Sequence, residues 1–221
     1  MRNPIPDQTS SQLASFPILY PDLKVPDFDL VKIVTKAKLR LQRKLAAGFY
    51  KKPAAQVRPV PIVSFTFDDF PLSALTEAGS MLSERHLQGT YYASAGLLGR
   101  QSIMGDMFNR SDLSALVHAG HELACHTFDH VRSCDVPGRE LLSQCEINRR
   151  HFAEMLDGYK VSNFSYPEGV VNPAAKRLLN SVYETCRTVE PGINRDPIDL
   201  GFLRANCIYT CLLYTSPSPR D

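Results

Sequence analysis

Residues 61–69 read PIVSFTFDD, an apolar and β-branched run that ends in two adjacent carboxylates. Such a run, bounded by a proline and by acidic residues, is typical of a buried strand. A helical pattern follows over residues 72–86. Its inward face is predicted to carry Leu75, Ala78 and Leu82. A strand followed by a helix indicates one unit of a β/α fold.

The same alternation repeats along the chain and predicts the α/β class. Further strands are predicted over residues 90–95, 121–125, 161–166, 185–189 and 203–209. Helices are predicted over residues 111–119 with Ser111 as N-cap, 135–157, and 172–182. Repeated units of this kind imply a parallel sheet or a (β/α) barrel, whose functional side chains follow the carboxyl ends of the strands.

Two adjacent acids, Asp68 and Asp69, close the first predicted strand. Neighbouring carboxylates repel each other, and burial penalises both, unless they bind something. One of them could ligate a cation while the other acts as a base. Taken alone, the pair is better explained as a turn with solvated acids.

A second cluster, HELACHTFDH, spans residues 121–130. A helical turn after the strand would project His126 and His130, which are four residues apart, to the same side. Two imidazoles and a carboxylate suit zinc or a similar divalent ion. Two surface histidines are the alternative for this spacing alone, but the acids at another strand end favour a metal. Strand alternation points Cys125 away from His126, so we predict that Cys125 lies in the core.

A third segment, NFSYPEG at residues 163–169, runs from a strand into a Pro/Gly loop whose N–H groups could bind an oxyanion. Taken in order, TFDD (66–69), HELACHTFDH and FSYPEG (164–169) resemble the polysaccharide deacetylase family, the NodB-homology domain of carbohydrate esterase family 4. The resemblance covers about residues 60–210. It implies a distorted (β/α) barrel that removes acetyl groups from N- or O-acetylated saccharides by hydrolysis.

The resemblance also implies a role for each matching residue. Asp68 would be the general base, and Asp69, His126 and His130 would hold the metal. Thr127 matches the position beside the first ligand histidine. The metal would be zinc first, with cobalt, nickel or manganese as alternatives.

The third segment both matches the family and departs from it. The Glu168 backbone N–H would serve the oxyanion, and Tyr166 and Pro167 would contact the substrate. The family often places an arginine after the phenylalanine of this motif, where it orients the base, but here that position is Ser165. Arg187, at the end of a later predicted strand, is expected to replace it.

The end of the chain raises a separate expectation. The family places its general-acid histidine on a late strand, and no histidine follows His151. Residues 211–221, CLLYTSPSPRD, resemble a translated sequencing adapter, the alternative being a disordered Ser/Pro tail. We therefore expect a C-terminally truncated, incomplete barrel over residues 60–210 that is inactive or nearly so. The alternatives are a metal- and sugar-binding module without turnover, or a metal-dependent hydrolase of another amide or ester bond.

The first part of the chain differs from the rest in charge. The whole chain has 25 Lys and Arg against 23 Asp and Glu, whereas residues 1–60 carry 11 basic and 4 acidic side chains. Prolines at residues 53–61 indicate a linker, so residues 1–59 are predicted to form an arm and a basic helix. Helical spacing over residues 31–49 places Val34, Ala37, Leu41 and Leu45 on one stripe.

This stripe has two interpretations. It could pack the helix against the barrel, with the lysines solvated. Alternatively, the eight basic residues of segment 31–52, which has no acid, could hold the helix on an anionic cytoplasmic membrane near lipid-linked sugars.

Composition narrows the remaining choices. An apolar fraction of 43% is globular, and the near-neutral charge of +2 disfavours a nucleic-acid partner. The N-terminal residues show no secretory signal, and no pair of the six cysteines forms CxxC. We expect a cytoplasmic protein without a disulfide framework, which could also bind the membrane surface peripherally. The particular saccharide and the oligomeric state stay open.

Overall fold

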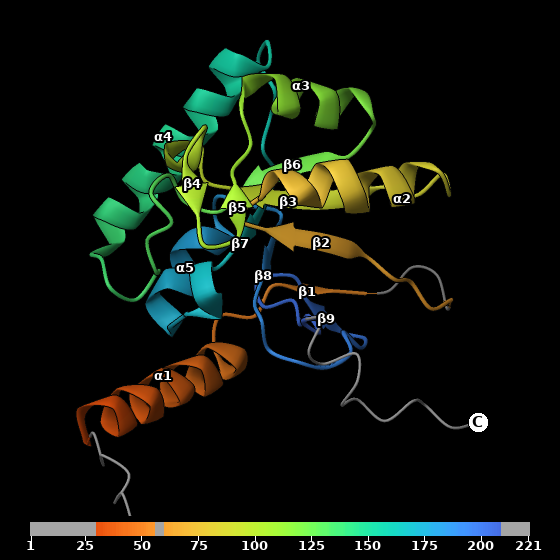
Figure 1. The fold of residues 1–221 in the computed structure, drawn as a ribbon. Helices are drawn as coiled ribbons and strands as arrows, with labels where there is room; N and C mark the ends of the chain where they lie inside the picture. The colour runs from red at the N-terminus through yellow and green to blue at the C-terminus, as the bar shows by residue number, and fades with distance from the viewer. Residues whose placement is uncertain (1–29, 56–59, 209–221) are drawn as a thin grey trace, which may run out of the picture.

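A computed structural model describes residues 30–55 and 60–208 (Figure 1). Its centre is a parallel sheet of five strands that curls into half of a barrel. The spatial order is β2 (Phe65–Asp68), β3 (Gly89–Ala93), β6 (Glu122–Cys125), β7 (Asn163–Ser165) and β8 (Thr185–Arg187). This architecture confirms the predicted α/β class and the distorted (β/α) barrel.

The helix α1 (Leu30–Gly48) precedes all the strands. The other helices follow strands as the alternation predicts: the π-helix η1 (Ala74–Gly79), α2 (Ser80–Ser83), α3 (Arg110–His118), α4 (Gly138–Met155) and α5 (Pro173–Asn180). Two short 3₁₀ helices, η2 (Ala95–Leu97) and η3 (Pro167–Gly169), follow strand ends. Two small antiparallel pairs complete the fold, β1 (Pro53–Ala54) with β9 (Ile198–Asp199) and β4 (Gln101–Ser102) with β5 (Gly105–Asp106).

The predicted elements differ from the structure in four places. The first strand begins at Phe65 rather than at residue 61, because Ile62 and Val63 are exposed and find no buried position. The predicted strand over 203–209 contributes, within residues 203–208, a single parallel bridge between Leu203 and Arg187. The predicted helix over 72–86 is a π-helix over Ala74–Gly79 rather than an α-helix throughout.

The fourth difference concerns the start of α3. Its N-cap is Asn109 rather than Ser111: the Asn109 Oδ1 atom accepts from the backbone N–H groups of Ser111 and Asp112. The Asp112 carboxylate accepts in turn from the Asn109 N–H at 2.8 Å. This reciprocal capping box satisfies more of the unpaired helix donors than a serine at position 111 alone could. By contrast, α5 begins as predicted, with Asn172 as the N-cap.

Aromatic side chains fill the core beside the first strands. The Tyr91 ring stacks on Phe67 with centroids 4.6 Å apart and tilts against Phe70. Phe70 stacks in turn on Phe108 at 4.9 Å. Tyr91, Phe70 and Phe108 are fully buried, so this stack fixes the turn that follows β2.

A ladder of hydrogen-bonded polar side chains crosses the sheet at the amino ends of its strands. Thr90 donates to Glu122 Oε2 at 2.7 Å, and Asn163 donates to Glu122 Oε1. Thr185 donates to Asn163 Oδ1 at 2.6 Å. These contacts link β3, β6, β7 and β8, so they fix the register that sets where each strand ends.

The α1 helix contacts α5 with the side that sequence spacing did not predict. Val34, Leu41 and Leu45 are 64%, 59% and 41% exposed, and Ala37 is exposed as well. The predicted packing of the barrel against this stripe is therefore wrong. The buried side of the helix is centred on Ala46 instead, because the small side chain lets the helix approach α5 closely.

A buried lysine ties α1 to the rest of the fold. Lys176 of α5 is fully buried, and its Nζ atom donates to the carbonyl of Ala46 at 2.8 Å and to Asp199 Oδ2 at 2.6 Å. Asp199 Oδ1 also accepts from the Lys52 N–H at 3.0 Å. Residues 53–54, inside the predicted linker, thus belong to a strand pair. The division of the chain at residues 59/60 stays a prediction.

The last points concern the C-terminal tail and membrane-spanning segments. The predicted tail, residues 211–221, lies outside the described residues. Within residues 30–55 and 60–208, every helix is too short or too polar to cross a bilayer.

We expect Lys176→Met to lower the free energy of unfolding by about 3 kcal/mol, because it leaves Asp199 without its charged partner. Urea unfolding at neutral pH measures this loss. Lys160→Met, at an exposed position, is the matched control and should change stability by less than about 0.5 kcal/mol. Equal stability of the two variants would show that the Lys176 pair does not hold α1.

Candidate metal and catalytic site

The predicted site residues meet at the carboxyl ends of β2, β6, β7 and β8. Non-glycine residues with positive φ concentrate there: Asp69 (61°), Phe70 (55°), Thr127 (62°), His130 (56°) and Glu168 (54°). L-residues rarely adopt this conformation, which persists only where the surroundings enforce it. The strained backbone therefore occurs in the loops whose side chains point toward one position beyond the ends of the strands.

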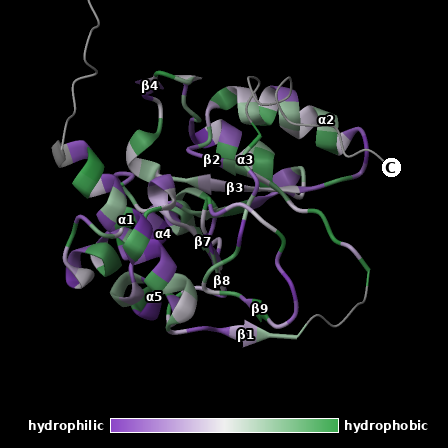
Figure 2. Ribbon diagram, turned by 90° about the horizontal axis from the view of Figure 1, so that it is seen from below, coloured by the Kyte–Doolittle hydropathy of each residue, from purple (hydrophilic) through white to green (hydrophobic). Residues whose placement is uncertain are grey.

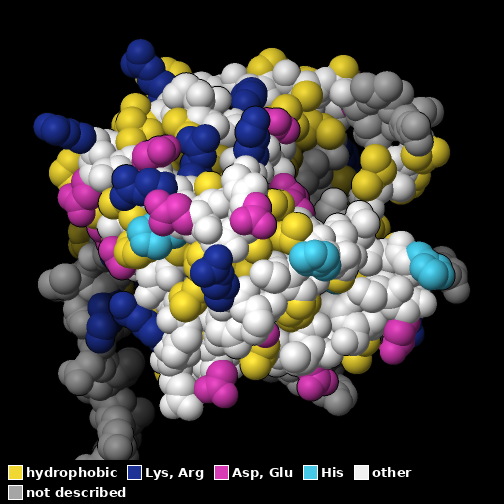
Figure 3. Space-filling view, turned by 90° about the horizontal axis from the view of Figure 1, so that it is seen from above, with side chains coloured by type: hydrophobic (Ala, Val, Ile, Leu, Met, Phe, Trp, Pro, Cys, Tyr) yellow, Lys and Arg dark blue, Asp and Glu magenta, His cyan; other side chains and the backbone are white. Residues whose placement is uncertain are grey.

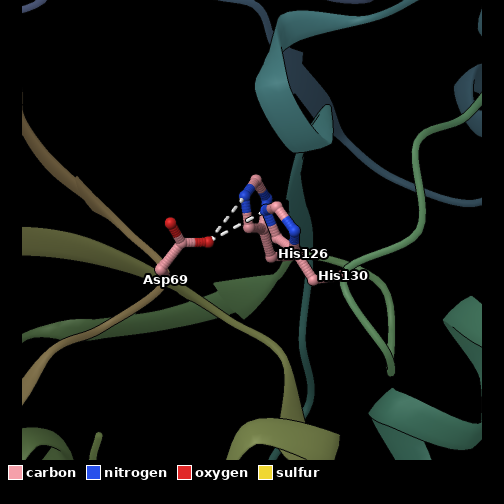
Figure 4. Close-up of side chains that lie close together, drawn as sticks. All are labelled: Asp69, His126 and His130. Atoms are coloured by element: carbon pink, nitrogen blue, oxygen red, sulfur yellow. Dashed lines mark ion pairs between the residues drawn. The ribbon is translucent and has the colours of Figure 1, made fainter. Parts of the chain in front are cut away.

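Asp69, His126 and His130 face one another across this point (Figure 4). Asp69 Oδ1 lies 3.0 Å from Nε2 of His130 and 3.5 Å from Nε2 of His126. The ligand atoms of all three lie within 4.8 Å of one another. Donors bound tetrahedrally to one zinc ion lie about 3.3 Å apart, given bonds of about 2.0–2.1 Å. The spacing therefore suits a single ion.

The tautomer of His126 is set by its second nitrogen. The ring is 1% exposed, and Nδ1 lies 2.8 Å from the carbonyl oxygen of Ser165, to which it donates. Nε2 is then the unprotonated nitrogen that faces Asp69. Burial lowers the pKa of His126, which favours the neutral imidazole that binds metals.

The Asp69 carboxylate is charged and incompletely satisfied. Burial raises the pKa of Asp69, but the contact with His130 and the charges of the two histidines lower it more, and the net pKa is below 3.8. That contact in turn raises the pKa of His130. Even so, the buried Oδ1 atom has no hydrogen bond of acceptable geometry within the described residues. A buried anionic oxygen between two imidazole nitrogens fits a divalent cation.

The loop that carries His130 is not the helical turn that the sequence predicts. Residues 126–130 form an irregular loop instead. Thr127 Oγ1 accepts a backbone N–H four residues further on at 2.9 Å. Gln144 of α4 accepts from the N–H of Asp129 at 2.9 Å and donates to its carboxylate. Side-chain hydrogen bonds therefore shape the loop that carries His130, and a sequence motif does not reveal them.

Asp68 faces a different partner from Asp69. Arg187 Nη2 donates to Asp68 Oδ1 and, at 2.8 Å, to Ser165 Oγ. The guanidinium also lies over the ring of Tyr92, 4.8 Å from the ring centroid. Burial lowers the pKa of Arg187, but Asp68 raises it more, so the guanidinium stays charged. The two adjacent acids therefore occupy two distinct electrostatic environments.

The strand register explains how Arg187 reaches the site. Ser165 on β7 and Arg187 on β8 are paired neighbours in the sheet. A long side chain at position 187 can therefore reach the side chain of position 165 from the next strand. The structure thus brings together Asp68, Ser165 and Arg187, as the sequence position of Arg187 suggested.

The loop after β7 contributes its backbone rather than its predicted side chains. The Tyr166 side chain is fully buried and donates its hydroxyl to the Gly201 carbonyl at 3.3 Å, and Pro167 is buried too. Side chains with no free surface give the predicted substrate contacts no support. Glu168 is exposed, and its carboxylate lies 3.4 Å from Arg132 Nη1. Among the described residues no acceptor receives the Glu168 N–H.

Sequence reasoning missed the residues that hold the site from behind. Asn148 of α4 accepts from the Ala95 N–H at 2.7 Å and donates to the Ala93 carbonyl at 2.9 Å and to Cys125 Sγ at 3.2 Å. This confirms the predicted core position of Cys125. A polar residue in the middle of the buried face of a helix was the available signal. Tyr92, beneath Arg187, gave no such signal, since a tyrosine in a strand is ordinary.

A half-barrel with a carboxylate and two imidazoles at its strand ends defines a hydrolase-type site suited to a divalent metal. Residues 55–183, more than half of the chain, match the profile of the family described as polysaccharide deacetylase. The chain therefore belongs to the polysaccharide deacetylase family and is a carbohydrate deacetylase by class. Deacetylases of carbohydrate esterase family 4 are metal-dependent, and Asp69, His126 and His130 form a group able to hold a metal.

Solved structures share the fold. IcaB from Ammonifex degensii superposes with a TM-score of 0.62 at 23% identity, over 76% of this chain and 73% of that one. The Streptococcus pyogenes deacetylase PplD, solved in complex with acetate, gives 0.60 at 17%, over 74% and 69%. BC0361, a polysaccharide deacetylase from Bacillus cereus, gives 0.53 at 17%, over 64% and 45%. No curated protein matches the sequence.

We expect His130→Ala to weaken the binding of Zn²⁺ or Co²⁺ at least about tenfold, because it removes one of three protein ligands. Calorimetry with the metal alone measures the affinity, and the visible spectrum of bound Co²⁺ reports the ligand set. His86→Ala, at an exposed position after α2 and outside the triad, is the control. Equal affinity in wild type and His130→Ala would exclude His130 as a ligand.

Proposed function

We propose that this chain hydrolyses the acetyl group of an N- or O-acetylated saccharide with a metal held at Asp69, His126 and His130. The observation that carries the proposal is the convergence of two units at the strand ends: the triad with its unsatisfied carboxylate oxygen, and Asp68 held by Arg187. One unit suits a cation and the other a base. Both are needed for hydrolysis of an acyl bond.

The metal we propose is zinc first, with cobalt, nickel or manganese as alternatives. One carboxylate oxygen and two imidazole nitrogens are borderline ligands that suit these ions, and no sulfur ligand lies in the triad. When bound, such an ion would polarise the acetyl carbonyl and ease deprotonation of a water molecule.

Asp68 is proposed as the general base. Its side chain is 33% exposed, so it is accessible to water and substrate. Arg187 engages Oδ1, and among the described residues no donor contacts Oδ2. Oδ2 is therefore the oxygen that would accept the proton of the attacking water. Arg187, anchored by Ser165, would hold the carboxylate in the orientation for this transfer.

The backbone N–H of Glu168 is proposed as the donor to the negative charge that develops on the acetyl oxygen. Its left-handed conformation turns the loop sharply after β7, and its N–H has no acceptor among the described residues. A fixed donor of this kind stabilises an oxyanion without reorganising during the reaction.

The possible substrates differ in whether their leaving group must be protonated as it departs. Of the six histidines, His126 and His130 alone lie in the loops that follow the described strands, and the triad uses both. An amine leaving group must be protonated as it departs, whereas an activated phenol leaves as an anion. We therefore propose that this chain cleaves N-acetyl groups slowly and activated acetyl esters more readily. A saccharide-binding module without turnover would cleave neither.

We expect metal-dependent hydrolysis of 4-nitrophenyl acetate, with acetate release from N-acetylated chito-oligosaccharides much slower. Asp68→Asn should lower kcat about 100-fold or more, because it removes the base. Glu146→Gln, an exposed carboxylate on α4, is the matched control. Metal-independent turnover, or full activity of Asp68→Asn, would contradict the proposal. Metal binding with no turnover of either substrate would identify the non-catalytic module.

We expect Arg187→Lys to lower kcat about tenfold or more while KM and metal affinity stay near wild type. The lysine keeps the positive charge but loses the planar guanidinium that joins Asp68 to Ser165. Steady-state kinetics on the aryl ester separates kcat from KM. If KM rises and kcat is unchanged, Arg187 contacts substrate rather than orienting the base.

A further inference from the structure

The α1 helix presents a row of apolar side chains to solvent, here called the outer stripe. It consists of Val34, Ala37, Leu41 and Leu45, spaced three or four residues apart and all exposed. Residues at this spacing lie on one side of a helix, and the stripe runs for about 17 Å at a rise of about 1.5 Å per residue. In Figure 2 hydrophobic and hydrophilic residues both occur along this helix.

The opposite side of α1 makes the contacts with the protein, and it is the more polar side. Ala46 is fully buried there, and Leu39, Gln42 and Arg43 are half-buried. Arg43 pairs with Glu190 at 3.4 Å. An amphipathic helix on a globular protein ordinarily turns its apolar side inward. Since α1 does the reverse, packing within the described residues does not account for the outer stripe.

Positive charge surrounds the outer stripe. On a helix of 3.6 residues per turn, Lys38 and Lys44 lie about 60° to either side of Leu41. The sequence has no acidic residue between Asp29 and Asp68. Elsewhere the surface is mixed: basic and acidic side chains are interspersed over the face seen in Figure 3. Basic residues along the edges of an apolar stripe are typical of helices that lie on anionic membranes.

We infer that α1 binds the surface of an anionic lipid bilayer, with the outer stripe inserted among the lipids and Lys38 and Lys44 at the headgroups. The charge pattern favours lipid over a second copy of this chain. A symmetric pair would bring two basic helices together, so like charges would oppose the contact. An anionic surface attracts the same lysines.

Co-sedimentation of the whole chain with vesicles tests this inference without reference to catalysis. We expect binding to phosphatidylcholine vesicles that contain phosphatidylserine, and much weaker binding to phosphatidylcholine alone. Added salt should reduce binding to the anionic vesicles, because it screens the lysines. Failure to bind anionic vesicles at low salt would overturn the inference.

Two sets of exposed substitutions separate the apolar and charged contributions. Val34→Gln with Leu41→Gln should lower the partition coefficient about tenfold or more. Lys38→Gln and Lys44→Gln should each lower it roughly fivefold on anionic vesicles alone. Met81→Gln, an exposed apolar position on α2, is the matched control and should bind as wild type.

Thermal unfolding of each variant shows whether the fold is retained, as expected for exposed positions. Equal vesicle binding by wild type and the Val34/Leu41 variant would overturn the inference. So would a dimer in sedimentation that the variant abolishes while wild type ignores vesicles, because the occupant of the stripe would then be a second copy.

Discussion

A buried carboxylate oxygen of Asp69, held against two imidazole nitrogens, is the constraint on which the site depends. Burying an anion is unfavourable unless charge and hydrogen bonds compensate it. His130 supplies part of that compensation, as the opposite pKa shifts of the two groups show. The Asp69 Oδ1 atom between the two rings stays without a hydrogen bond of acceptable geometry within the described residues, and a divalent cation bound there would compensate its negative charge. The polar ladder at the strand starts and the aromatic stack behind β2 fix the positions of these strand ends.

The second constraint is that two neighbouring acids must act independently. Asp68 closes β2 in extended backbone, whereas Asp69 adopts a positive φ. Their carboxylates therefore turn toward different partners, the guanidinium of Arg187 and the two imidazoles. Separate environments are how two carboxyl groups in one site acquire different roles. The arginine acts from β8 because the register sets it beside Ser165, which leaves room for its side chain.

The sequence predicted the elements that depend on local pattern and missed those that depend on tertiary hydrogen bonds. The strand–helix alternation, the start of the helix at residues 172–173 and the grouping of Asp69, His126 and His130 at strand ends all follow from local sequence pattern. The loop at residues 126–130 did not, because Gln144 shapes it from another helix. The substrate contact predicted for Tyr166 stays a prediction, because a motif does not state whether a side chain is buried, as that of Tyr166 is. For α1, periodicity located the apolar stripe but not which side packs.

X-ray absorption of the zinc-loaded chain reports which atoms bind the metal. With Asp69, His126 and His130 as ligands, we expect oxygen and nitrogen at about 2.0–2.1 Å with the outer scattering of two imidazole rings, and one ring fewer in His130→Ala. Sulfur at about 2.3 Å, or a spectrum without imidazole scattering, would place the metal at a cysteine or elsewhere and exclude this ligand set.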